Sequence, residues 1–451
     1  MTSRRVLYDK TQYADTPVRS YWEHTAGRPL RPFDSLSGDA SYDVAVIGGG
    51  YTGLSTALHL VRDHGMSVCV LECGHMGWGA SGRNGGFGCF PAAKLELGEL
   101  ISRYGLEETR RFYSAQLDGL QLIRDLCRSE RIDCDLVGDG NLEVAHKPDR
   151  VHGLVEYAAD LDRHFGITCR VLDREEFRAT AFDSEEQFGG LYIEAGFGLH
   201  PLKLAAGLAD SACRHGAVLY PHSEVVSWER PGNGHILTTR EGRVKAARVV
   251  VATNGYTREG LHPGFDGKLL PAMSNIVTTR PLTPEELAAH CWKTLNPVCN
   301  TRTLLFYFRM LPDNRLLFGA RGDTTGTARD GERMKQWMVR RLGEVFPHWR
   351  DVPISHYWRG LVCVTRKMTP SIGRDLGDPT VYYGFGYHAN GVNTAPWAGL
   401  QIAEMIARGD DGADRIPAIC RGMPRKFPLA GMRLWYLRSA YQYYRFVDKL
   451  L

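Results

Sequence analysis

The glycine-rich segment Gly48–Gly53 (GGGYTG) constrains the fold of this chain more than any other feature, because of what flanks it. A short β-branched run, Tyr42–Ile47, precedes it, and a helical pattern of apolar residues follows it up to Gly65. A second apolar strand, Val68–Leu71, completes a β-α-β unit of about 30 residues. In such a unit the first glycine permits a tight turn, the second lets the backbone approach a pyrophosphate, and the third lets the helix pack on the sheet.

Two further features of this unit predict a bound dinucleotide. The helix that follows the glycines offers free N–H groups and a partial positive charge to phosphates at its N-terminus, and Tyr51 and Thr52 of the fingerprint are included among the cofactor-binding residues. Glu72 closes the second strand, where a carboxylate can accept hydrogen bonds from a ribose diol. We therefore assign a pyrophosphate to the three glycines of the fingerprint, Gly48, Gly50 and Gly53. FAD and NAD both use this unit.

A second glycine-rich segment bears on the choice between the two cofactors. Residues 74–88 (GHMGWGASGRNGGFG) contain seven glycines where a nicotinamide enzyme usually begins another amphipathic helix. Backbone this permissive suits a second part of an extended ligand. A third segment near the other end of the chain repeats the strand, loop and helix order, with a strand at Thr380–Tyr383 and a helix at Thr394–Arg408. We predict that the early and late stretches belong to one sheet.

Composition excludes several classes of protein. With 451 residues, 43% of them hydrophobic and 24% charged, the chain is globular and long enough for two or three domains. Residues 421–451 contribute +6 to the net charge of +4, which leaves −2 for the rest, so no basic surface for nucleic acid is expected. The eleven cysteines form no CxxC pair and predict neither a metal site nor disulfides. No apolar run predicts a signal peptide or a spanning helix, so we expect the protein in the cytoplasm.

These motifs resemble those of the D-amino-acid-oxidase-like flavoproteins. The resemblance begins with GASGRNGG at Gly79–Gly86, after the dinucleotide fingerprint. Further segments follow in the family's order: RIDCDLVGDGNLEVA at 131–145, GLHPLKLAAGLADSA at 198–212, VVVATNGYT at 249–257, WRGLVCVTRKMTPSIGR at 358–374 and GFGYHANGVNTAPWAGLQIAEMIARGD at 384–410. The resemblance covers nearly the whole chain and is more specific for the family than for a substrate.

The resemblance implies FAD as the cofactor, held without a covalent bond. Four sets of residues would surround it: Ser81, Arg83, Asn84, Gly85 and Gly86 along the pyrophosphate and flavin; Val225 at the adenine; Ala252, Thr253 and Asn254 beside the cofactor; and Gly386, Asn390, Gly391, Val392 and Asn393 under the pyrimidine edge of the ring. The helix from Thr394 would direct its positive end at the flavin N1 and C2 carbonyl, where negative charge develops on reduction.

Departures from the family pattern shape the substrate hypothesis. Glycine oxidase and D-amino-acid oxidase place a carboxylate-binding arginine two residues after the glycine of a WRG motif, and this chain has Val362 there. We therefore expect an amine without an α-carboxylate, or one whose acid group is remote. The alternating strand Leu304–Leu311 puts Tyr307 and Arg309 on one face, and Arg309 is the candidate for a remote acid. His388 is a further catalytic candidate, although its loop reads HANGV where relatives have a shorter turn.

Two other positions concern the flavin. The sarcosine oxidases use a lysine for oxygen activation on the strand that here reads Arg315–Gly319, and this chain has a leucine at that place, so oxygen is expected from the family and not from these residues. Cys363 lies near, but not at, the position where some relatives attach the flavin covalently. An ordinary buried thiol is the favoured interpretation.

The fold prediction is an α/β protein with a Rossmann-like FAD-binding domain and a second, antiparallel-sheet (α+β) substrate domain. The domains are assigned as an N-terminal arm at 1–40, an FAD-binding domain at 41–95, 195–262 and 355–410, a substrate domain at 96–194 and 263–354, and a basic aromatic tail at 411–451. We expect the tail to dock on the body in preference to a membrane surface, because its apolar residues form no clean face.

The predicted reaction is hydride transfer from a C–H beside an amine to flavin N5, giving an imine that water hydrolyses. Oxygen would reoxidise the flavin to give hydrogen peroxide, and the other partner is a small-molecule amine or amino-acid-derived substrate. One alternative is a dehydrogenase of the same fold that passes electrons to a quinone or carrier protein. Another is a flavin-binding subunit without its own turnover.

Overall fold

The computed structural model describes residues 6–27 and 33–450, and the parts of the predicted arm at 1–5 and 28–32 lie outside this description. The early β-α-β unit forms as predicted, and it is the centre of the first sheet. The strands of this sheet lie in the order β17 (Ser371–Arg374), β18 (Val381–Phe385), β11 (Gly242–Val251), β1 (Gly38–Ile47), β2 (Val68–Leu71) and β8 (Val218–Tyr220), with β10 (His235–Thr238) and β9 (Ser227–Glu229) continuing from β11.

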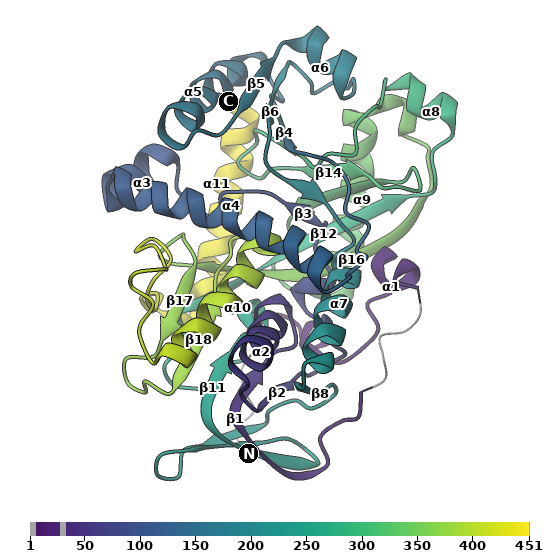
Figure 1. The fold of residues 1–451 in the computed structure, drawn as a ribbon. Helices are drawn as coiled ribbons and strands as arrows, with labels where there is room; N and C mark the ends of the chain where they lie inside the picture. Colours follow the sequence, from purple (N-terminus) through teal and green to yellow (C-terminus); the bar gives the residue numbers. More distant parts are fainter. Residues whose placement is uncertain (1–5, 28–32, 451) are drawn as a thin grey trace.

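The first sheet joins the two ends of the chain. Strand β18 runs parallel to β11, and β11 runs parallel to β1, so the late strand-loop-helix segment and the early one share a sheet, as predicted. The inner strands are buried on both faces, and helices α2 (Tyr51–His64), α7 (Pro201–Arg214) and α10 (Gly391–Arg408) pack against one another over one side (Figure 1). The carboxyl ends of the parallel strands therefore meet at one edge, with the N-terminus of α2 beside them.

The second sheet is antiparallel apart from one parallel pair. Its order is β16 (Ile354–Thr365), β12 (Leu269–Thr279), β15 (Leu316–Arg321), β14 (Tyr307–Met310), β13 (Val298–Asn300), β4 (Asn141–Val144), β6 (Gly190–Ile193) and β5 (Cys169–Leu172). Strands β14 and β15 form an antiparallel hairpin around Asn314. Residues 354–365 belong to this sheet, because β16 pairs with β12 along its length. The assignment of 355–410 to the FAD-binding domain is therefore wrong for this strand.

Helices and one small β-pair complete the architecture. The remaining elements are α3 (Leu97–Tyr104), α4 (Leu106–Ser129), α5 (Val151–Phe165), α6 (Arg174–Thr180), α8 (Pro284–Ala289) and α9 (Ala328–Val345), with β3 (Phe87–Gly88) paired to β7 (Phe197–Gly198). Helix α4 packs against α10 and crosses between the two sheets (Figure 1). None of the helices in the described residues combines the length and the apolarity that crossing a membrane requires.

The two terminal segments pack on the body. Trp22 of α1 (Tyr21–Thr25) is 1% exposed and donates its indole N–H to Asn84 O at 2.8 Å, so the arm reaches the second glycine-rich segment. In the tail, α11 (Arg433–Leu450) buries Leu434, Leu437 and Tyr441 against the cluster that contains Met273 of β12. Docking of the tail is what we predicted, and the side of α11 that carries Trp435, Tyr443 and Phe446 is exposed.

Candidate active site

The carboxyl edge of the first sheet borders a cavity that we call the first cavity. Its lining comes from Tyr13 of the arm and from six stretches of sequence: 47–52, 71–84, 224–225, 252–261, 362–363 and 387–395. Thirteen of the residues predicted to bind the cofactor line it: Gly48, Gly50, Tyr51, Thr52, Glu72, Ser81, Asn84, Val225, Ala252, Thr253, Asn254, Gly391 and Val392. The tertiary structure thus brings the two glycine-rich segments and the late loop to one place.

The glycines of the fingerprint fit a ligand that lies against the backbone. Gly48 has φ +110°, which disfavours any side chain, and a Cβ there would lie 2.9 Å from the backbone of Ala252. A Cβ on Gly50 would lie 2.8 Å from Ser81 Oγ, on the side where Ser81 accepts a hydrogen bond from Tyr51 N–H at 2.9 Å. The cleft between these segments therefore stays open to a phosphate group, and the N-terminus of α2 leaves N–H groups without partners in its own helix.

Glu72 has the surroundings expected of a ribose-binding carboxylate. It lines the first cavity and accepts hydrogen bonds from Gly49 N–H at 2.6 Å and Gly74 N–H at 3.0 Å. Burial raises the pKa of Glu72, and these two N–H groups oppose part of that rise. Each carboxylate oxygen retains a lone pair for a further donor, so the donor and acceptor set fits the pyrophosphate and ribose of FAD.

A second cavity, about 250 Å³ in volume, lies under the antiparallel sheet and adjoins the first. Five residues line both cavities: Ala80, Asn84, Val362, Ala389 and Val392. Predicted residues Arg83, Gly85 and Asn390 line only the second. A ligand in the second cavity would consequently touch whatever occupies the near end of the first.

Tyr307 lines the second cavity, as expected for a residue on the sheet that faces the flavin. Its ring passes over Gly319 on the next strand, and its hydroxyl lies 2.8 Å from Ser274 Oγ. Burial raises the pKa of Tyr307 to about 12, so the phenol keeps its proton at neutral pH. Tyr307 can therefore offer a hydrogen bond but no negative charge.

Arg309 does not bind a substrate group from the position that the structure gives it. The side chain is 1% exposed and donates to Gly85 O at 3.0 Å and to Leu199 O at 2.6 Å. The alternation rule places it on the face of Tyr307, but the β3–β7 pair covers that part of the face, and a Cβ on Gly198 would lie 2.3 Å from Arg309 Nη1. Arg309 lines neither cavity, and its Nε and Nη2 donate to backbone carbonyls, so this position of the side chain does not support the prediction that it binds a remote acid.

His388 is fully buried and lines the first cavity. Its Nε2 lies 3.4 Å from Thr365 Oγ1, and its Nδ1 has no hydrogen-bond partner among the described residues. Burial, aided by the positive charge of Lys94, lowers the pKa of His388 to about 3, so the imidazole is neutral at physiological pH. Its catalytic role stays a prediction, and that role does not include a positive charge.

Four predicted residues lie outside both linings and support the loops instead. Gly53 passes so close to Gly48 O that a Cβ would lie 2.0 Å from it, and Gly86 similarly approaches Leu199 O. Gly386 N–H donates to Asn254 Oδ1 at 2.9 Å. Asn393 donates from Nδ2 to Gln116 O at 3.3 Å and so anchors the start of α10 to α4.

Sequence reasoning missed the charged residues of the second cavity, Lys94, Glu143 and Arg321. Each is a single charge in an apolar stretch (PAAKL, NLEVA and LLFGAR), and only such a break in the apolar pattern could have indicated it. Cys363 lines the first cavity but is 1% exposed, and burial raises the pKa of its thiol to about 12, so little reactive thiolate is present. No cluster of metal-ligating side chains occurs within residues 6–27 and 33–450.

A dinucleotide-type cleft that opens onto a cavity under an antiparallel sheet defines a two-domain flavin-dependent oxidoreductase. The chain belongs to the family of FAD-dependent oxidoreductases named DAO, whose sequence model matches residues 43–405, and its cofactor is FAD. It is 33% identical to gamma-glutamylputrescine oxidoreductase of Escherichia coli (strain K12), over 96% of this chain and 98% of that one. It is 30% identical to a probable oxidoreductase, OrdL, of Haemophilus influenzae, over 96% and 97%. The crystal structure of glycine oxidase from Geobacillus kaustophilus superposes with a TM-score of 0.67 at 24% identity, over 84% of this chain and 99% of that chain.

Proposed function

We propose that the chain oxidises an amine at the carbon beside the nitrogen, with oxygen as the final electron acceptor. The observation that carries this proposal is the meeting of the two cavities at Asn84, Val362 and Ala389. Bound FAD would supply the oxidising group, which takes a hydride from that carbon at N5. The substrate would leave as an imine, and water would convert the imine to a carbonyl compound and an amine or ammonia.

The residues around the junction support a reaction without a protein acid or base. His388 is neutral and Tyr307 keeps its proton at neutral pH, so neither would carry charge into the reaction. Lys94 and Arg321 line the second cavity, as Tyr307 does, and their positive charges disfavour a protonated amine close to them. These residues would therefore keep the reacting amine in its neutral form, from which a hydride can leave.

The nature of the amine follows from two observations. Val362 lines both cavities where relatives such as glycine oxidase would have an arginine, which supports a substrate without an α-carboxylate at that point. The E. coli relative is named for γ-glutamylputrescine, an amine, and we propose an amine or amino-acid-derived substrate for this chain. The buried cysteines have free thiols, which supports a reducing compartment, and we infer that this is the cytoplasm; they are Cys69, Cys89, Cys134, Cys363 and Cys420.

Anaerobic reduction of the bound flavin tests the proposal. The holoenzyme would be mixed with diamines, γ-glutamylated amines, N-methyl amino acids, cyclic imino acids, glycine and D-alanine, and the visible absorbance of the flavin would be followed. We expect one or more of the first four classes to bleach it rapidly and glycine and D-alanine to do so poorly. Rapid bleaching by D-alanine would contradict the substrate proposal, and no bleaching by any amine would contradict the function.

Reoxidation of the reduced enzyme in air separates oxidase from dehydrogenase. We expect stopped-flow mixing with oxygen to restore the flavin absorbance rapidly and to release hydrogen peroxide. A flavin that stays reduced in air for long periods would instead indicate transfer to a quinone or a carrier protein.

A further inference from the structure

Four charged residues line the second cavity, and three of their side chains have no hydrogen-bond or ion-pair partner within residues 6–27 and 33–450; the fourth, Arg83, donates to Trp78 O at 2.7 Å. Lys94, Glu143 and Arg321 all line it, and no hydrogen bond or ion pair joins any of these three side chains to another described residue. Lys94 is exposed and the other two are half-buried, yet protein surrounds Lys94 and Glu143 closely enough to shift the pKa of each, as expected of side chains that line a hollow. An uncompensated charge that is largely removed from solvent is costly, which applies to the half-buried Glu143 and Arg321, and such charges are normally paired. Groups of opposite charge on a ligand would supply the missing partners.

Arg321 is held rigidly at the end of β15. Its strand pairs Arg321 with Ser274, and Ser274 in turn pairs with Gly360 of β16, so these three residues form a row that ends beside the cavity junction. The next residue, Gly322, accepts a hydrogen bond from Asn275 Nδ2 at 3.1 Å. The backbone at Arg321 is therefore fixed on both sides.

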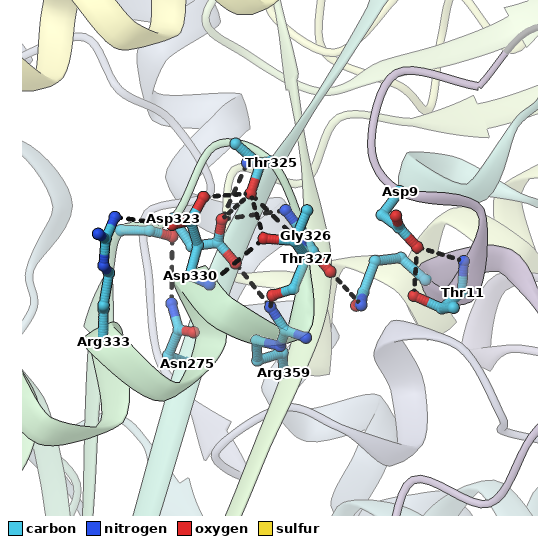
Figure 2. A network of polar contacts seen from close by, with 12 residues as sticks. Asp9, Thr11, Asn275, Asp323, Thr325, Gly326, Thr327, Asp330, Arg333 and Arg359 are labelled. Atoms are coloured by element: carbon cyan, nitrogen blue, oxygen red, sulfur yellow. Dashed lines mark hydrogen bonds and ion pairs between the residues drawn. The ribbon is translucent and has the colours of Figure 1, made fainter.

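The loop after Arg321 is also rigid, because a buried carboxylate organises it (Figure 2). Asp323 accepts hydrogen bonds from Thr325 N–H at 2.9 Å and Gly326 N–H at 3.0 Å, and it pairs with Arg359 of β16 at 2.7 Å. Asp9 N–H of the arm donates to Thr325 O at 2.8 Å. Asp323 therefore neutralises Arg359, whereas Arg321, at the end of β15, lines the cavity without such a partner.

Lys94 approaches the same end of the cavity from the segment between β3 and α3. Its N–H donates to Met368 O at 2.9 Å, and Asn390 of the late loop donates to Pro91 O, so this segment is tied to the loop that borders the first cavity. Lys94 and Arg321 line the same cavity, and burial together with the positive charge of Arg321 lowers the pKa of Lys94 to about 7. We call Lys94 and Arg321 the cation pair.

Glu143 lies at the other end of the cavity. The strand register sets Glu143, Cys299, Tyr307 and Gly319 in one row across β4, β13, β14 and β15. Three strand spacings of about 4.8 Å separate Glu143 from the strand of Arg321, so their backbones are roughly 14 Å apart. Burial alone raises the pKa of Glu143 to about 7, and no cation lowers it. The register therefore separates the positive charge of Arg321 from the negative charge of Glu143 by three strands of the cavity wall.

Building on the proposed function, we propose that the substrate is an amine that also has a carboxylate, bound by Lys94 and Arg321, and an ammonium group, bound by Glu143. The oxidised carbon would lie on the junction side of the cation pair, because β16 lines both cavities and β15 is two strands away from it. The carboxylate would then sit farther from the junction than the position of Val362. Arginine forms two parallel hydrogen bonds to a carboxylate, and a second cation beside it strengthens such a site.

Binding of small probes tests this assignment in the holoenzyme whose flavin has first been reduced with dithionite, so that no probe can be oxidised. The probes are pentanoate, pentylamine and 5-aminopentanoate, and binding would be followed anaerobically through thermal stabilisation. We expect the wild type to bind 5-aminopentanoate about tenfold or more tightly than either single-charge probe, since a hydrogen bond to a charged group typically contributes this much. This comparison requires no variant to fold.

Four variants then assign the contacts. Lys94→Met and Arg321→Met should each weaken the two carboxylate probes about tenfold or more and leave pentylamine unchanged. Glu143→Gln should weaken only the two probes that contain an amine. The charge-keeping Lys94→Arg should retain the carboxylate affinity, and Arg340→Met, a change on the exposed side of α9, is the matched control.

The result separates this inference from the proposed function. Equal binding of the three probes by the wild type, or undiminished pentanoate binding by Lys94→Met and Arg321→Met, would overturn the assignment of the cation pair. Bleaching of the wild-type flavin by amines would in that case still uphold the function. If probe binding follows the prediction but no amine bleaches the flavin, the charge assignment stands and the oxidase proposal fails.

Discussion

Replacing Gly53 by alanine is the sharpest test of the cofactor cleft. An alanine in a helix is ordinarily about 1 kcal/mol more favourable than a glycine, so propensity alone predicts a more stable protein. The structure predicts the opposite, because the new Cβ would lie 2.0 Å from Gly48 O and 3.0 Å from Val46 Cγ1. The nearer atom belongs to the backbone and cannot rotate away, so α2 must move off the strand that precedes it.

The magnitude follows from that movement. Overpacking costs about 1–3 kcal/mol in well-packed cores, which offsets or exceeds the propensity gain. The same movement displaces Gly50 and the first turn of α2, both at the first cavity. We expect Gly53→Ala to lose most of its bound FAD during purification and to unfold at lower temperature than the wild type.

Gly153→Ala is the matched control for this change. Gly153 lies on the exposed side of α5, and a Cβ there would meet nothing within 4 Å. This variant should keep its full FAD content and gain up to about 1 kcal/mol in stability. The measurements are the flavin-to-protein absorbance ratio and the thermal unfolding curve. A Gly53→Ala protein with wild-type FAD content and wild-type or higher unfolding temperature would refute the close-packing argument.

Two further outcomes follow from the packing and the charges. Leu437→Ala should lower the free energy of unfolding by about 2–5 kcal/mol in urea denaturation, because Leu437 packs α11 onto the body. Tyr443→Ala, on the exposed side of α11, should change the free energy of unfolding by no more than about 0.5 kcal/mol. Equal effects of the two variants would show that the tail is not docked. The Lys94 ammonium, with its pKa near 7, is charged below that pH and neutral above it, so pentanoate should bind the holoenzyme more weakly as the pH rises through neutrality. Glu143 lines the same cavity and its pKa is also about 7, so its ionisation adds to this decline. Lys94→Met should remove the part due to Lys94, and Glu143→Gln the part due to Glu143. A flat wild-type profile, or a profile equally steep in Lys94→Met and the wild type, would contradict the role of the Lys94 amine.

Much of the FAD-binding fold could be predicted because its signals are local. The β-strand, the glycines and the helix of the first unit are consecutive in the chain, and each residue type answers a constraint set by its immediate neighbours. Strand β2 therefore has the predicted bounds, and α2 ends where Gly65 provides a left-handed cap. The predicted domain boundary at residue 355 was wrong because no local feature of β16 indicates which of the two sheets the strand joins.

The residues of the site likewise fall into those that local sequence predicts and those that only the tertiary structure brings together. The sequence by itself determined the dinucleotide cleft. Close approach of the backbone to a phosphate requires glycine at fixed spacings, and these spacings can be recognised directly in the amino-acid sequence. Only the tertiary structure decided where the lone charges go: Arg309 is covered by the β3–β7 pair, while Arg321 and Lys94, 227 residues apart in the chain, face one cavity. Burial and the field of a charge depend on which surfaces the folded strands bring together, and no periodicity along one strand records them.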